Sequence, residues 1–265
     1  MVKRTLWEGA GIGIELSKFG PSEKHPVHAD RHSRITFVLS GQFWEVTDIG
    51  GVSVAEGDVL FKSRNVRHED QFDDSGVRLA SVVFRTDERC PLERCGLERL
   101  WTVKRSAEYL RSYVSILEAS FANDGQAIEA AVADLLSFER DPRRSCARPP
   151  SWLKRLKLDL EAASLATINV ARRARDAGVH PVHASRLFRQ LFSVSITEHA
   201  LYHCVRGAIA MFGRKPMDLS EIAVSAGFYD QSHMTRVFGR VTGKTPGRYR
   251  NLTAQAIARC EGDIG

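Results

Sequence analysis

The second half of the chain is organised around seven residues, Ile222-Ala223-Val224-Ser225-Ala226-Gly227-Phe228. Ala226 is small enough to let another helix approach, and Gly227 supplies the left-handed backbone that commonly ends a helix. Asp218 and Glu221 precede them at the spacing of a capping box. The stretch therefore predicts a short helix that begins near Asp218 and ends in a tight glycine turn.

A second helix is expected directly after this turn, from Gln231 to Arg240, with Asp230 placed to cap it. Its apolar residues predict an inward face made of Met234, Val237 and Phe238. The remaining polar residues face outward; they are Gln231, Ser232, Thr235, Arg236 and Arg240. A short polar helix that carries arginine after such a turn is suited to a DNA major groove, where guanidinium matches the guanine edge.

The same pattern occurs once more, about fifty residues earlier. Ala174-x-x-Ala177-Gly178-Val179 matches Ala223-x-x-Ala226-Gly227-Phe228, and Arg186-Leu187-Phe188 matches Arg236-Val237-Phe238. In this copy Asn169 is the expected cap of the first helix, and Pro181 stands at the start of the second, where its missing N–H is harmless. The outward candidates are Val182, His183, Ser185, Arg186 and Arg189. Two copies in register predict a pair of helix-turn-helix units.

The first copy departs from the pattern at three positions. Arg173 stands where the second copy has the inward residue Ile222, and Ser193 stands where it has Gly243. Ala184 replaces a larger apolar residue. Looser packing is therefore expected in the first unit.

Charge is divided unevenly along the chain. Residues 151–265 contain 17 Lys+Arg and 9 Asp+Glu, a net of +8, whereas residues 1–150 contain 21 and 23, a net of −2. A basic excess confined to one part is what a polyanion binder requires, because lysine and arginine displace the counterions of phosphates.

With these features, residues 152–252 resemble the AraC/XylS family of bacterial transcription regulators. The densest match runs from Ile222 to Phe238 and continues through Val241-Thr242-Gly243-Lys244-Thr245-Pro246-Gly247-Arg248-Tyr249-Arg250. The resemblance implies two helix-turn-helix units joined by a helix at about 196–212, with recognition helices in successive major grooves. By family position, the residues that face bases are Val182, Ser185, Arg186, Gln231, Ser232 and Arg236. The implied partners are double-stranded promoter DNA and RNA polymerase. The implied role is the activation or repression of transcription.

The first ninety residues read as short strands, which favour a sandwich or barrel. Two of them, 34–40 and 42–47, flank Gly41 as an expected hairpin, and Gly50-Gly51 marks a further turn. The region resembles the cupin-like sensor domain of many such regulators, on Gly57-Asp58-Val59-Leu60-Phe61 through Asn65-Val66-Arg67-His68, with His28 and Gly41 in the first motif. We therefore predict an α+β chain: a cupin-like β-barrel followed by an all-α domain with two helix-turn-helix motifs.

The same resemblance indicates a pocket for a small effector near His28 and His68. A metal site at His28, His32 and His68 is the alternative, but Arg34 stands at a ligand position and an arginine cannot be a ligand. No metal, cofactor or catalytic residue is therefore predicted. The rival functions are a metal-dependent cupin oxygenase and a DNA-repair or methyl-acceptor protein, which would need a reactive cysteine.

Between these parts, apolar periodicity predicts two amphipathic helices, at Tyr109–Leu117 and Ile128–Leu136, which are candidates for a homodimer interface. A proline-containing linker follows at 141–150. The predicted divisions are a sensor domain at 1–90, a helical dimerisation segment with linker at 91–150, a DNA-binding domain at 151–253 and a tail at 254–265.

The remaining features predict a cytoplasmic protein. No signal peptide or membrane span is recognisable. Five cysteines have no framework spacing; they are Cys90, Cys95, Cys146, Cys204 and Cys260. A Cys90–Cys95 disulfide would offer a redox signal as the alternative to a small molecule. The sequence leaves open activation or repression, the promoter and the effector.

Overall fold

The computed structural model describes residues 2–9, 11–85, 101–138, 149–162, 169–213 and 217–262. They form two compact units. One unit comprises Met1–Arg140 with Thr242–Gly265, and the other comprises Asp141–Val241. Within the described residues, no helix is both long enough and apolar enough to cross a bilayer. Cys90, Cys95, Cys146 and most of the predicted linker lie outside the described residues.

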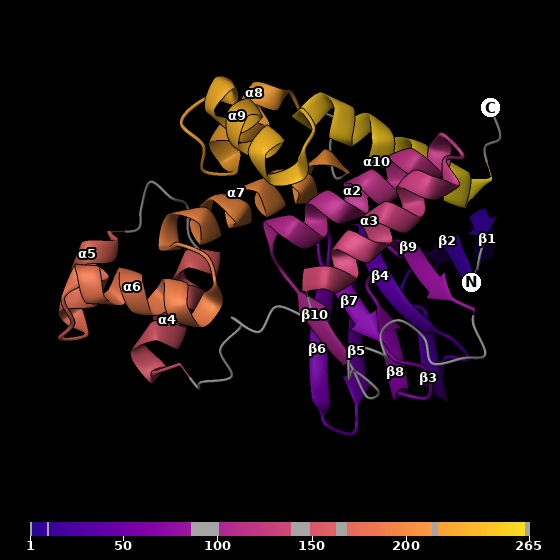
Figure 1. Cartoon of the computed structure of the whole chain (residues 1–265), viewed down its shortest axis with the longest axis horizontal. Helices are drawn as coiled ribbons and strands as arrows, with labels where there is room; N and C mark the ends of the chain where they lie inside the picture. The colour runs from indigo at the N-terminus through magenta and orange to yellow at the C-terminus, as the bar shows by residue number, and fades with distance from the viewer. Residues whose placement is uncertain are drawn as a thin grey trace. The chain divides into compact units, whose positions relative to one another are not determined.

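The first unit is built on two antiparallel sheets (Figure 1). The six-stranded sheet has the order β1 (Val2–Gly9), β2 (Ile12–Phe19), β9 (Val77–Phe84), β4 (Ser33–Ser40), β7 (Val59–Lys62) and β10 (Trp101–Lys104). The four-stranded sheet has the order β3 (Lys24–Ala29), β8 (Arg67–Phe72), β5 (Gln42–Thr47) and β6 (Gly50–Ala55). In the described part of the chain no strand pairing joins the sheets, so the closed barrel is corrected to a sandwich.

The predicted hairpin around Gly41 is wrong, although both of its strands exist. β4 pairs with β7 and β9, whereas β5 pairs with β6 and β8 in the other sheet. Gly41 takes a φ of +84°, and a Cβ there would lie 2.2 Å from the carbonyl oxygen of Gly76. The glycine therefore turns the chain from one sheet to the other. The turn between β5 and β6 lies at Asp48-Ile49, and the predicted turn residues Gly50 and Gly51 are the first residues of β6, paired with Thr47 and Val46.

Strand alternation explains how both faces of the six-stranded sheet are covered. The inward residues of the two sheets form one apolar cluster: Phe19, Val38, Phe43, Val54, Leu60, Phe72, Val77 and Leu79. On the other face of β4 and β7, Phe37 stacks on Tyr113 with ring centroids 4.4 Å apart, and Phe61 packs edge-on against Tyr109. β4 and β7 are thus buried on both sides, which accounts for their nearly continuous apolar sequences.

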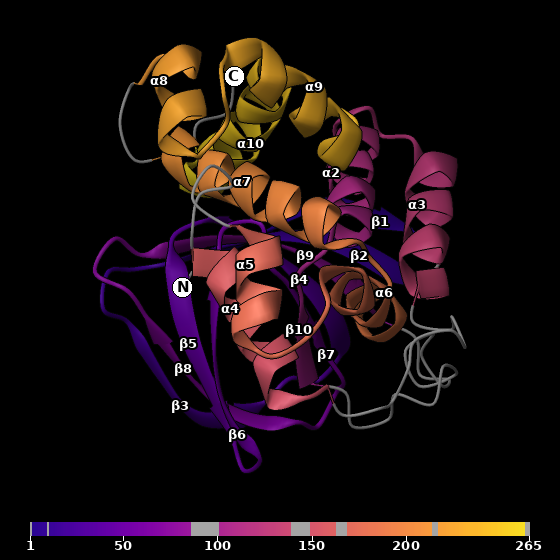
Figure 2. The same ribbon diagram turned by 90° about the vertical axis from the view of Figure 1, so that its left-hand side faces the viewer.

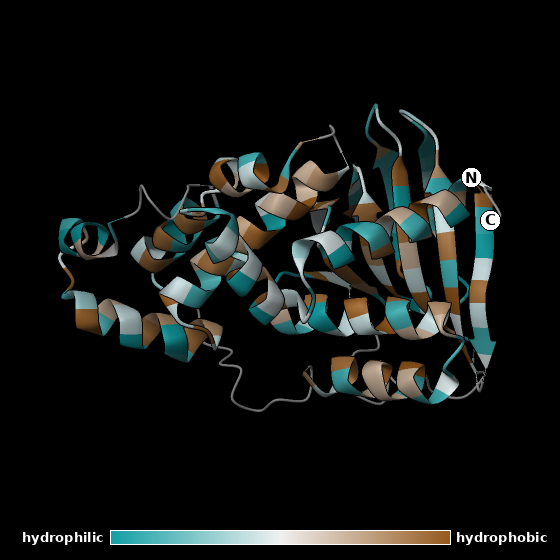
Figure 3. Ribbon diagram, turned by 90° about the horizontal axis from the view of Figure 1, so that it is seen from above, coloured by the Kyte–Doolittle hydropathy of each residue, from teal (hydrophilic) through white to brown (hydrophobic). Residues whose placement is uncertain are grey.

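Helices α2 (Ala107–Phe121), α3 (Gly125–Ser137) and α10 (Pro246–Glu261) complete this unit. Figure 2 shows α2 and α3 on the opposite side from β3, β5, β6 and β8. The predicted dimerisation stripes are buried in this core, at Tyr109, Leu110, Tyr113, Val114, Leu117, Ile128, Val132 and Leu135. Because these side chains pack within their own chain, they are corrected from an interface to core. Figure 3 shows the mixed hydrophilic and hydrophobic colouring of the helices that such one-sided burial produces.

Helix α10 packs against β1, β2, β4, β9 and α2. Its buried side chains include Tyr249, Ala256 and Cys260. Residues 254–261, expected as tail, continue this helix because Ala256 and Cys260 keep its apolar face in register with Tyr249. The last part of the region that resembles the DNA-binding family is therefore built into the first unit.

The second unit is helical: α4 (Ser151–Ala162), α5 (Val170–Asp176), α6 (Pro181–Phe192), α7 (Ile196–Phe212), α8 (Leu219–Ser225) and most of α9 (Gln231–Thr242). One cluster joins α4, α6 and α7, at Leu153, Leu156, Leu160, Phe188, Ile196 and Ala200. Helix α7 spans the predicted bridging segment, and the side chain of Ser195 caps it by accepting from the amide of Glu198.

Candidate functional site

The two predicted glycine turns have the same backbone geometry. After α5, the amide of Val179 donates to the carbonyl of Ala174 at 2.9 Å, and Gly178 takes a φ of +70°. After α8, the amide of Phe228 donates to the carbonyl of Ala223 at 2.9 Å, and Gly227 takes a φ of +88°. The repeat read from the sequence is therefore also a repeat of hydrogen bonds.

The helix starts also follow the predicted capping pattern. Asn169 Oδ1 accepts from the amide of Arg172 at 2.9 Å. The amide of Asp218 donates to Glu221 Oε2 at 3.1 Å, which is the return hydrogen bond of a capping box. Asp230 Oδ1 accepts from the amide of His233 at 2.6 Å and so fixes the start of α9. His180 caps α6, a role that the sequence reading missed.

Helix α9 presents the polar face that was expected. Met234 and Phe238 are fully buried, and Val237 is buried. The outward residues are exposed at Gln231, Ser232, Arg236 and Arg240. Thr235 is half-buried, and its hydroxyl donates to the carbonyl of Gln231 at 2.9 Å, so its hydroxyl proton is already used within the helix.

Helix α6 presents a comparable face in the first copy. Ala184 and Phe188 are fully buried, while the side chain of Val182 is 65% exposed. The other expected outward residues are all exposed; they are His183, Ser185, Arg186 and Arg189. Tyr229 is a further exposed residue that the sequence reading missed, at 88% exposed, and it directly precedes the cap of α9.

The departures of the first copy have structural consequences. Arg173 is half-exposed and its Nη1 lies 2.7 Å from Asp159 Oδ2, whereas the equivalent Ile222 is buried. Ser193 takes a left-handed backbone with a φ of +61°. The first copy therefore has an exposed ion pair where the second has an apolar core contact.

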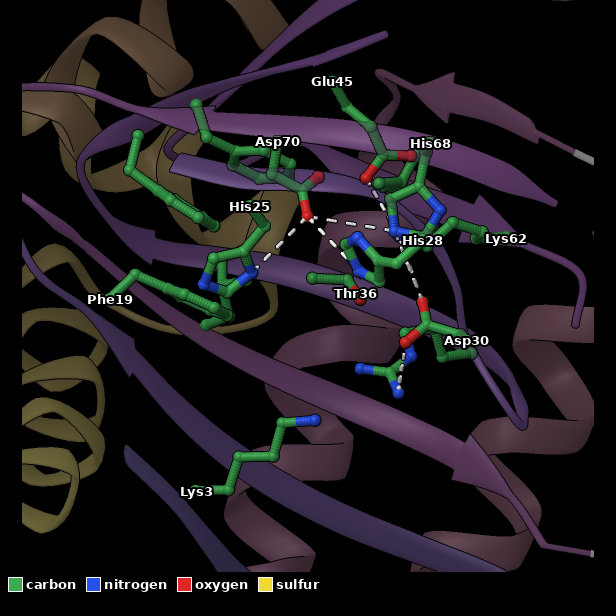
Figure 4. Close-up of a pocket in the computed structure, with 15 residues that line it drawn as sticks. Lys3, Phe19, His25, His28, Asp30, Thr36, Glu45, Lys62, His68 and Asp70 are labelled. Atoms are coloured by element: carbon green, nitrogen blue, oxygen red, sulfur yellow. Dashed lines mark hydrogen bonds and ion pairs between the residues drawn. The ribbon is translucent and has the colours of Figure 1, made fainter. Parts of the chain in front are cut away.

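A second candidate site is a cavity of about 60 Å³ between the two sheets (Figure 4). His28 and His68 line it from the paired strands β3 and β8, with ring centroids 4.2 Å apart. His32, the third member of the alternative metal site, is not among its lining residues. Asp30 and Arg34 form an ion pair with each other, with Arg34 Nη2 2.9 Å from Asp30 Oδ1.

Lys62 is the centre of the polar network in this cavity. Its Nζ lies 3.1 Å from Asp30 Oδ2, 2.9 Å from Glu45 Oε2 and 2.7 Å from His68 Nε2. Burial and the neighbouring Lys62 charge lower the pKa of His68, so its ring is neutral at pH 7. Nε2 then accepts from the ammonium, and Nδ1 donates to the carbonyl of Val66 at 2.8 Å.

The two aspartates of this cavity are shifted in opposite directions. Burial alone would raise the pKa of Asp30, but the charges of Lys62 and Arg34 outweigh it and lower that pKa to about 2. Burial raises the pKa of Asp70 to about 8. The positive charge of Lys62 acts to lower this pKa, and the nearby Glu45 and Asp30 act to raise it. The cavity thus holds one firmly ionised aspartate and one that keeps its proton at neutral pH.

Asp70 is the point on which three imidazoles converge (Figure 4). Its Oδ2 lies 4.0 Å from His25 Nδ1, 3.8 Å from His28 Nε2 and 3.8 Å from His68 Nε2. Sequence reading found His28 and His68 but missed His25, Glu45, Lys62 and Asp70. The available signal was alternation, because His68, Asp70 and Phe72 are buried at every second position of β8.

Comparison with known proteins supports the helical site. Residues 173–252 match the family model of a helix-turn-helix domain. The HTH-type transcriptional regulator GlxA of Rhizobium meliloti (strain 1021) is 30% identical over 125 residues. That alignment covers 46% of this chain and 38% of that protein, so the chain spans well under half of this relative's length.

Two solved structures were also matched. The C-terminal domain of AraT, a response regulator from Geobacillus stearothermophilus, is 21% identical over 40% of this chain and 88% of that chain, with a TM-score of 0.37. ToxT from Vibrio cholerae O395 is 8% identical over 92% of this chain and 98% of that chain, with a TM-score of 0.38. TM-scores this low carry no argument about the site. The match of residues 173–252 to the helix-turn-helix family model does carry one. Residues 173–252 are thus similar to a helix-turn-helix domain, and the predicted resemblance to AraC/XylS-type regulators is confirmed.

Proposed function

We propose that this chain, with its AraC/XylS-type helix-turn-helix domain, is a sequence-specific DNA-binding transcription regulator. The observation that carries the proposal is the repetition of one unit, a glycine turn followed by a helix with an exposed polar face. The faces of α6 and α9 each bear arginines, at Arg186 and Arg236. Arginine at such a place recognises guanine in the major groove.

The proposed base-facing residues are the exposed ones on these helices: Val182, Ser185, Arg186, Gln231, Ser232 and Arg236. The neighbouring Arg189 and Arg240 are proposed to contact the phosphate backbone, with His183 and Thr235 beside them on the same helices. The positive charge of the two arginines supports this division, because phosphate contacts position a protein while base contacts specify sequence. Promoter DNA is the proposed partner, with the regulator acting as a homodimer that contacts RNA polymerase.

The proposed sensor is the cavity between the sheets, lined by His28 and His68. Many of its lining side chains are charged or hydrogen-bonding, and its volume is well below the roughly 300 Å³ of ordinary ligand pockets, so it suits only a very small polar or ionic effector. A redox signal has less support among the described cysteines. Cys204 and Cys260 are buried, and burial raises the pKa of the Cys260 thiol to about 11, which keeps it unreactive. We propose no catalytic role, because Arg34, which stands at a metal-ligand position of cupins, is paired with Asp30.

The test is selection of DNA from a random duplex library by the full chain. The wild type is expected to enrich one sequence in two parts, separated by about one helical turn. An R186A/R236A double variant is expected to lose this enrichment while retaining weak, salt-sensitive binding to any duplex. Equal enrichment by both proteins would overturn the assignment of the helices, and no binding by the wild type would overturn the function.

A further inference from the structure

Helices α4 and α7 contact each other in the second unit (Figure 1). Three side chains from them form a cluster outside both sites described above. Glu161 comes from α4, and His199 and His203 come from α7. Glu161 Oε1 lies 3.4 Å from His199 Nε2 and 3.8 Å from His203 Nε2. The three groups can each offer one ligand atom, and these atoms all lie within 4.8 Å of one another.

The Nε2 atoms of the two imidazoles are buried without the hydrogen bonds that burial normally requires. A spacing of four residues places them on one face of α7, one turn apart. Their side chains are 6% and 7% exposed. Neither Nε2 has a hydrogen-bond partner in the described part of the chain. Leaving such a group unsatisfied is unfavourable, so two neighbouring ones aimed at the same carboxylate require an explanation.

We propose that Glu161, His199 and His203 bind a divalent transition-metal ion of the zinc class. Two imidazole nitrogens and one carboxylate oxygen are a common donor set for a single zinc ion. Ligand atoms about 2.0–2.1 Å from a tetrahedral ion lie roughly 3.3 Å from one another, close to the 3.4 Å and 3.8 Å found here. A water molecule would supply the fourth ligand.

One lysine competes with the ion for the carboxylate. Lys157, one turn before Glu161 on α4, pairs with the same Oε1 that the imidazoles face. Its side chain is 33% exposed, so it can move into solvent when an ion takes its place. The positive charge of Arg206 also acts on His203. Replacing Lys157 by a neutral residue should therefore strengthen metal binding.

The ion would bear on the first helix-turn-helix unit. The ring of His199 lies 5.5 Å, centroid to centroid, from that of Phe188, the fully buried residue of α6. Phe188 belongs to the same cluster as Leu160, which directly precedes Glu161. An ion that ties α4 to α7 would thus stiffen the core on which α6 rests.

The test is a cobalt titration of the full chain after dialysis against a chelator, at pH 7.5. The expected result is one equivalent bound, with the visible absorption of four-coordinate cobalt, which an equivalent of zinc removes. H203Q and E161Q should each weaken binding by at least about 10-fold, while K157Q should tighten it about two- to five-fold. Circular dichroism of each metal-free variant checks its fold.

The matched control is H28Q, which removes a histidine from one of the two groups of histidines and acids found among the described residues of the sandwich. It should leave the cobalt spectrum and stoichiometry unchanged. Absence of stoichiometric binding by the wild type overturns the proposal. So does binding that persists at full strength in folded H203Q and E161Q, or that is lost in H28Q instead.

Discussion

Ser193 and Gly243 follow α6 and α9 at equivalent positions, and both take a left-handed backbone, with φ of +61° and +76°. Glycine adopts this conformation without a steric cost, whereas a residue with a Cβ loses roughly 1 kcal/mol or more. The first copy of the repeat thus keeps the turn of the second copy while lacking the residue that suits it.

Replacing Ser193 by glycine is therefore expected to stabilise the protein by about 1 kcal/mol. Urea denaturation followed by far-ultraviolet circular dichroism measures the change. The mirror variant, G243S, should be destabilised by a similar amount, and G213S, at a φ of −93°, should show no such loss. A destabilised S193G would mean that the serine side chain contributes more than its backbone costs.

Tyr249 is 2% exposed in the packing of α10 against the first unit. Y249A should destabilise this unit by about 3–5 kcal/mol, because removing a buried aromatic side chain leaves a cavity. Hydrogen exchange should accelerate at the amides of β2 and α2, which α10 contacts. Arg248 provides the neighbouring control, since it is 68% exposed and its pair with Glu118 is worth under about 1 kcal/mol. Unchanged exchange in β2 would argue against this docking of α10.

The pKa shifts of the sandwich cavity predict opposite effects for its two aspartates. Asp70 has a pKa raised to about 8, so the folded state binds its proton more tightly than the unfolded state. That contribution to stability is complete below the ordinary pKa of about 3.9 and is lost as pH rises toward 8. D70N should therefore gain stability relative to wild type between pH 5 and pH 8, as measured by thermal unfolding.

Asp30 supplies the control of opposite sign for this experiment. Its pKa is lowered to about 2, so its contribution is present above the ordinary pKa and is lost as pH falls toward 2. D30N should be less stable than wild type at pH 7, because Lys62 and Arg34 lose a buried partner. If both variants shift stability in the same direction at pH 8, the assignment of the two protonation states is wrong.

Arg236 tests the proposed recognition helix at single-base resolution. R236A should weaken binding to the selected DNA sequence by about 1–3 kcal/mol and relax the preference at one base pair. Fluorescence anisotropy with a panel of single-base substitutions measures both effects. Arg67, exposed on β8, is the matched control and should leave affinity and preference unchanged. A uniform loss of affinity over all bases would instead identify Arg236 as a phosphate contact.

Local patterns predicted local structure well. Apolar spacing located the helices, and Gly178 and Gly227 marked their turns, because these features depend on residues a few positions apart. Strand pairing was harder to foresee. Which strands pair with β4 and β5 depends on residues far away in the sequence, because pairing is decided by how the faces of the sheets are buried. Gly41 was therefore predicted to be a hairpin turn, although it joins strands of two different sheets.

The site residues divide in the same way. The exposed faces of α6 and α9 follow from helical periodicity and were predicted except at Thr235, which is half-buried. The cavity network was foreseen only at His28 and His68, since Lys62, Glu45 and Asp70 meet there from three different strands. The spacing of His199 and His203 was readable, but their partner Glu161 lies 38 positions earlier, on another helix.

The position of α10 also bears on how such a protein can be recombined. The family match ends at residue 252, in the middle of a helix whose buried face belongs to the sandwich. A chimera in which everything after the linker is replaced would lose the native α10, which covers part of the sandwich. The helix that takes its place would not fit the sandwich surface. The sandwich unit and the helical unit are therefore joined at two places in the chain, and a working exchange has to redesign the second junction as well as the first.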